Sequence, residues 1–88
     1  MRAQDILPDR QDEGDFGGIT IRKGTVAAFL ANARAWTQAR PDTPARAQAA
    51  REIERDLPAL RALGLLEVLE IRDAALRAFV AGASADPA

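Results

Sequence analysis

The sequence contains no cysteine, no histidine and no tyrosine, and its only serine is Ser84. Without cysteine there is no disulfide framework, no thiolate metal site and no thiol redox switch. Without histidine the chain lacks the commonest general base, and without cysteine it lacks the most readily activated nucleophile. These absences argue against an enzyme, and they predict a chain with no catalytic residues, no bound metal and no cofactor.

Long hydrophobic runs are missing as well. No segment approaches the roughly 20 apolar residues that a membrane-spanning helix needs. The first nine residues, MRAQDILPD, contain no apolar stretch of the length found in a signal peptide. We therefore expect a soluble, cytoplasmic protein that makes no contact with a membrane.

Charges of the two signs are balanced. Twelve basic residues, eleven of them arginine, accompany thirteen acidic residues, so the formal net charge is −1. We attribute the many arginines to the base composition of a GC-rich bacterial genome. Because phosphate backbones are bound by a net basic face, nucleic acid is not expected to be the main partner.

Bulky apolar side chains are few. The hydrophobic fraction is 48%, but aromatic residues make up only 5%, and much of the rest is alanine, which favours helix and buries little area. A compact monomer of this mass exposes roughly 5000 Å² and has room for one small core. We expect a single domain whose apolar residues are partly shared with a second chain.

The N-terminal segment is polar, and four acidic residues surround Gly14: Asp9, Asp12, Glu13 and Asp15. An EF-hand loop counted from Asp9 would need a glutamate where the chain has Thr20, so a calcium site is rejected. The predicted organisation is an acidic arm, one small globular domain and a disordered tail: residues 1–15, 16–81 and 82–88.

A strand followed by a helix is predicted next. In residues 16–22, Ile19 and Ile21 alternate with polar residues after a pair of glycines. Residues 26–38 form the best-patterned helix, with Thr25 as its expected cap. Five side chains make an apolar stripe at helical spacing: Val26, Phe29, Leu30, Ala33 and Trp36.

A second helix is predicted to begin at Pro44. Two prolines in residues 40–44 end the first helix, and Thr43 before Pro44 is a typical helix start. Pro58 interrupts the pattern, so we expect a kink or a restart there. Gly64 is expected to end the segment.

Residues 65–71 (LLEVLEI) fit either a helix or a strand. A single helix over residues 65–79 would place Arg72 in its apolar stripe, which is costly for an unpaired charge. A strand over residues 66–71, followed by a helix that Asp73 caps, avoids this cost, and we prefer it.

The predicted order is strand, helix, helix, strand, helix. This is a mostly helical α+β fold, with a small two-stranded antiparallel ribbon packed on a helical hairpin. Two strands have open edges and are marginal alone, which predicts a homo-oligomer, with a two-fold dimer favoured. It would form either by pairing strands or through a small-residue face of the first helix. The candidate interface residues are Ala27, Ala31, Ala35 and Trp36, although Trp36 is by default a core residue.

One short segment offers a local binding mechanism. Arg22 and Lys23 stand beside Gly24, Thr25 and a helix N-terminus, where N–H groups and the helix dipole favour an anion. A phosphate, a carboxylate or an acidic segment of a partner would suit this turn. The alternative is an ordinary strand-to-helix turn with solvated cations.

Three stretches resemble a group of short, uncharacterised proteobacterial proteins: residues 19–33 (ITIRKGTVAAFLANA), 60–68 (LRALGLLEV) and 71–77 (IRDAALR). The stretches contain no chemically specific motif. The resemblance implies no activity, and no functional residue is carried over from it.

The sequence thus predicts a small bacterial protein that is a non-catalytic protein-interaction or self-association module with an unknown protein partner. An anion or ligand binder that uses residues 22–25 is the alternative. A nucleic-acid-binding regulator is less favoured, because a recognition helix starting at Asp73 would offer only Arg77 to DNA.

Overall fold

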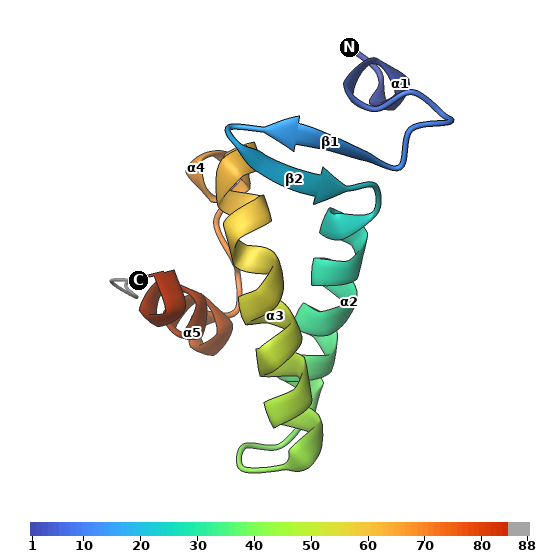
Figure 1. Cartoon of the computed structure of the whole chain (residues 1–88). Helices are drawn as coiled ribbons and strands as arrows, with labels where there is room; N and C mark the ends of the chain where they lie inside the picture. The colour runs from blue at the N-terminus through green and yellow to red at the C-terminus, as the bar shows by residue number, and fades with distance from the viewer. Residues whose placement is uncertain (85–88) are drawn as a thin grey trace.

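The computed structural model describes residues 1–84 of the chain. Within this range the chain forms one β-hairpin and a set of helices (Figure 1): α1 Ala3–Ile6, β1 Glu13–Phe16, β2 Ile19–Arg22, α2 Thr25–Gln38, α3 Pro44–Leu63, α4 Leu65–Val68 and α5 Ala74–Ser84. α2 and α3 run antiparallel, the β-hairpin lies across one end of this pair, and α5 lies beside it. The predicted fold class is confirmed: a mostly helical α+β fold with a two-stranded antiparallel ribbon on a helical hairpin.

The ribbon takes its second strand from an unexpected part of the chain. β2 lies in the segment predicted as the first strand, but its partner is β1, whose first three residues belong to the predicted arm. Gly17 and Gly18, with φ values of 60° and 83°, make the two-residue turn between the strands, because both positions of such a turn need positive φ. The register pairs Glu13 with Arg22 and Phe16 with Ile19.

The strand predicted over residues 66–71 is wrong, and so is the single helix over residues 65–79. Gly64 (φ 79°) ends α3 and directly precedes α4. The chain therefore re-enters a helical turn, and only from Leu69 (φ −117°, ψ 147°) does it become extended. α5 then begins after Asp73, whose Oδ1 accepts a hydrogen bond from the Leu76 N–H at 2.8 Å, so the predicted cap is confirmed.

α2 is preceded by Gly24 in the left-handed conformation (φ 89°), and Thr25 is already its first residue. The Thr25 hydroxyl donates to the Arg22 carbonyl at 2.7 Å instead of accepting from a helix N–H. The prediction that Thr25 caps this helix is therefore wrong. Glycine adopts positive φ with little strain, which explains why the turn uses it.

α3 begins as predicted, with the Thr43 side chain accepting from the Arg46 N–H at 3.2 Å and Pro44 in the first turn. It then runs through Pro58 without restarting, so the predicted restart is wrong, whereas the predicted kink stays a prediction. Pro58 is exposed, while Leu57 and Leu60 beside it are buried in the core. Packing of these two leucines holds the helix together across the proline.

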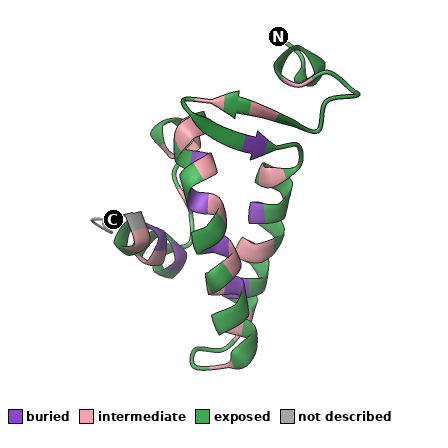
Figure 2. Ribbon diagram, in the orientation of Figure 1, coloured by how far each residue is buried: buried purple, intermediate pink, exposed green. Residues whose placement is uncertain are grey.

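The core lies where α2, α3 and α5 face one another (Figure 2). Its buried members are all apolar: Phe29, Trp36, Ala49, Ile53, Leu57, Leu60, Leu76 and Val80. Half of them come from α3, whose residues Ile53 and Leu60 have no exposed area. α3 is thus the central element, and the best-patterned segment of the sequence, α2, covers one side of it.

The last three described residues, 82–84, are the last turn of α5, although the sequence places them in the tail. The rest of the predicted tail, residues 85–88, lies outside the described residues.

Candidate functional site

The candidate anion-binding turn joins β2 to α2. Here the Lys23 ammonium donates to the Pro8 carbonyl at 2.8 Å and to the Asp9 carbonyl at 3.2 Å. The Lys23 N–H also donates to the Asp12 carbonyl. Lys23 therefore ties the N-terminal segment to the turn, and its charge is directed at the chain's own backbone.

The other charges of this turn are exposed. Arg22 Nε lies 3.8 Å from the Glu13 carboxylate, with the two side chains 84% and 56% exposed. Asp12 borders the same shallow hollow as Arg22, Lys23 and Gly24. A carboxylate in that position opposes a bound anion. Anion binding by Arg22, Lys23, Gly24 and Thr25 stays a prediction, and the arrangement of these charges does not strengthen it.

Trp36 is a candidate interface residue from the sequence, but in the structure it lies in the core. Trp36 is only 8% exposed. It stacks on Phe79 with ring centroids 5.4 Å apart and an interplanar angle of 22°, and the Arg46 guanidinium lies 3.5 Å from its centroid. Trp36 is a core residue that joins α2, α3 and α5.

The alanine face of α2 is on the surface. Ala27, Ala31 and Ala35 are all exposed, on the side of α2 away from the core. Their role as interface residues stays a prediction. Ala27 and Ala31 lie three residues from Leu30 and Arg34 respectively, and residues at this spacing are neighbours on a helix surface.

Sequence reasoning missed the apolar side chains that remain exposed. The three most exposed on the body of the fold are Val68 (82%), Leu69 (57%) and Leu30 (55%). Leu30 and Leu69 border the same hollow of about 510 Å³, between α2 and the chain that joins α4 to α5. The apolar run in residues 65–71 was the available signal, but the preferred strand interpretation assigned it to the ribbon.

A second apolar hollow, of about 440 Å³, lies between the N-terminal segment, the β-hairpin and the start of α2. Its exposed members include Ile6 (46%) and Val26 (36%). Leu7 lies against Gly14, where an added Cβ would come within 2.8 Å of the leucine side chain. The chain's own N-terminal segment thus already covers part of this hollow.

The Asp56 carboxyl group has a raised pKa. Burial raises its pKa above the ordinary value of 3.8, the Glu52 carboxylate raises it further, and Arg55 lowers it. A carboxyl with a raised pKa binds its proton more tightly in the folded chain than in the unfolded one. Its ionised form therefore destabilises the fold.

Replacing Asp56 with asparagine is expected to raise the free energy of unfolding near neutral pH. The contribution of the protonated Asp56 carboxyl to the free energy of unfolding is fully present below about pH 3.8. It is lost as the pH rises through the raised pKa of this group. The advantage of Asp56→Asn should therefore shrink as the pH falls toward 3.8. Urea unfolding across this range measures it, with the exposed Glu54→Gln on the same helix as control. An advantage that grows on acidification would contradict the assignment.

Residues 1–84 contain no group of three or more acidic side chains arranged to hold a metal ion. None of the helices in this range has both the length and the apolar character needed to cross a membrane. A scan against protein-family models, a search of curated proteins and a search of solved structures found no match to the chain. The resemblance to short proteobacterial proteins stays a prediction.

Proposed function

We propose that the chain is a small, non-catalytic module that acts by binding protein, and that its first partner is a second copy in a two-fold homodimer. The observation that carries this proposal is an excess of surface. The chain exposes 6483 Å², whereas a compact monomer of its mass exposes roughly 5000 Å².

The shape of the molecule supports the proposal. The radius of gyration is 13.9 Å, with extents of 40 × 26 × 23 Å, whereas a compact chain of this length has a radius of about 12 Å. An interface of standard size removes about 800 Å² from each partner. Dimerisation would therefore bring the exposed area of each chain closer to that of a compact protein.

The kind of side chain exposed supports it too. Leu30, Val68 and Leu69 leave more than half of their area in water, and burying such a side chain fully contributes about 1.5–3 kcal/mol. The absence of histidine, cysteine and tyrosine supports the non-catalytic part of the proposal. The cytoplasmic location and a further protein partner remain predictions from the sequence.

Light scattering over a micromolar concentration series tests the proposal. We expect a mass near twice the 9.4 kDa of one chain, falling toward 9.4 kDa on dilution. A constant mass of 9.4 kDa at every concentration would rule out the homodimer.

A further inference from the structure

We infer that two copies dock through residues 68–72, called the connecting segment, which comprise the last residue of α4 and most of the link to α5, with the two-fold axis close to Ile71. The inference rests on the proposed function and names the surface that performs it. Three independent features of this segment support it: its shape, its charges and its backbone.

The connecting segment separates two hollows. The larger, about 510 Å³, lies toward α2 and is bordered by Leu30 and Leu69. The smaller, about 300 Å³, lies toward α5 and is bordered by Leu69 and Val80. Val68 and Leu69 are exposed on the same segment. Exposed apolar side chains next to hollows suit a two-fold interface, because each copy then supplies both partners of the contact.

The charges of the segment are self-complementary. Glu70 and Arg72 flank Ile71, both are exposed, and neither forms an ion pair within residues 1–84. If two segments meet antiparallel at Ile71, Glu70 of each copy lies opposite Arg72 of the other. Facing opposite charges are favourable and facing like charges are unfavourable. The two symmetric Glu70–Arg72 pairs therefore favour a second copy of the chain over an unrelated chain as the partner at this surface.

The backbone of the segment resembles an unpartnered strand. Leu69 is extended, and the N–H groups of Glu70 and Ile71 have no backbone acceptor within the described part of the chain. Unpaired N–H groups in an extended segment are a template for pairing with another chain. The Ile71 carbonyl already accepts from the Arg77 guanidinium at 2.9 Å, so the N–H groups are the ones left to pair.

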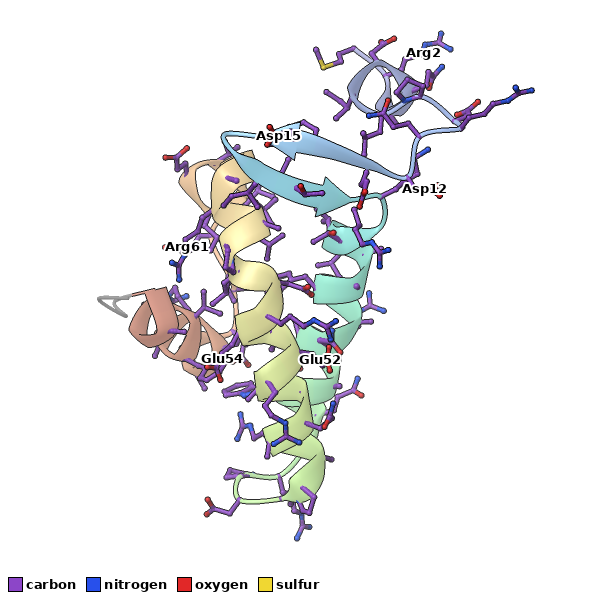
Figure 3. The ribbon with its side chains drawn as sticks, in the orientation of Figure 1. Arg2, Asp12, Asp15, Glu52, Glu54 and Arg61 are labelled. Atoms are coloured by element: carbon purple, nitrogen blue, oxygen red, sulfur yellow. The ribbon has the colours of Figure 1, made fainter. Side chains whose placement is uncertain are left out.

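Other surfaces are less suited to a second copy. Asp12, just before β1, and Asp15 within it lie along this strand (Figure 3), and Glu13 is its first residue. Pairing two such edges would therefore bring like charges together. The hollow beneath the N-terminal segment is partly filled by the chain's own Leu7, and Lys23 holds this segment in place.

The first test places a charge on the segment. Leu69→Arg is expected to weaken the dimer at least about tenfold, while circular dichroism stays unchanged because Leu69 is 57% exposed. Ile6→Arg, at a residue 46% exposed on the other apolar surface, is the matched control and should leave the dissociation constant unaltered. A Leu69→Arg dimer as tight as the parent, or equal weakening by Ile6→Arg, would overturn the assigned surface.

The second test exchanges charges. Glu70→Arg and Arg72→Glu should each weaken the dimer about two- to thirtyfold, because each places like charges opposite one another in two symmetric pairs. The double variant E70R/R72E restores the pairing and should recover the parent dissociation constant. A double variant weaker than either single variant would overturn the antiparallel arrangement. A parent chain that is monomeric throughout would instead remove the proposed function, so the two failures are distinguishable.

Discussion

Replacing Trp36 with alanine is expected to lower the free energy of unfolding by about 3–5 kcal/mol. The indole contacts Phe79 of α5 and Arg46 of α3, so the substitution removes a contact shared by three helices. A domain of this length has a total stability of about 4–13 kcal/mol. The variant should therefore lose much of its cooperative transition in urea, followed by far-ultraviolet circular dichroism.

Trp36→Phe is the control for this prediction. A phenyl ring can keep the stack on Phe79, and a large apolar replacement leaves a smaller cavity than alanine does. Most of the lost stability should therefore return. A Trp36→Ala variant that keeps the parent stability but has half the parent mass would support the interface role that the structure argues against.

Replacing Pro58 with alanine is expected to raise the free energy of unfolding by up to about 3 kcal/mol. Pro58 lies inside α3, where it has no N–H to donate to the Glu54 carbonyl and its ring crowds the preceding turn. The side chain is exposed, so alanine would restore the helix bond without disturbing the core. The urea midpoint measures the gain.

Pro44→Ala provides the matched control, because it makes the same change at the first position of the same helix. Proline is favoured there, since the missing N–H would have no partner in the helix. We therefore expect Pro44→Ala to lower the free energy of unfolding slightly. Equal gains at both positions would show that the effect of Pro58 does not come from its place inside the helix.

The helices α2, α3 and α5 were predictable because their signals are local. The apolar stripe of α2, the Thr43 cap before Pro44, the Asp73 cap and the Gly64 stop each act within one or two turns of chain. The continuity of α3 through Pro58 also shows the limit of local rules. Pro58 would break an isolated helix, but buried leucines on either side of it keep α3 continuous.

The hairpin could not be predicted fully, because β1 has a sequence that is poor for a strand. Glu13, Gly14 and Asp15 are residue types depleted in strands. They become one because two glycines reverse the chain and Leu7 packs against Gly14. Such a strand is specified by contacts with the rest of the molecule and leaves little trace in its own composition.

Of the residues considered for a functional site, some could likewise be placed from the sequence and others could not. Position in the helical stripe indicated a core role for Trp36, which the structure confirms. The exposure of Leu30 was not predictable, because it depends on where α5 and the chain leading to it lie against α2. A stripe read from sequence shows which residues share a face, but not how much of that face the remaining elements cover.

The position of the indole has a consequence for following this molecule in solution. The chain has one tryptophan and no tyrosine, so its near-ultraviolet emission comes from a single fluorophore. That fluorophore touches a cation on one helix and an aromatic ring on another. Its intensity and wavelength therefore record, without any attached dye, whether α5 is seated against the α2–α3 pair. A spectral change that precedes the loss of helical signal would report the departure of α5 alone.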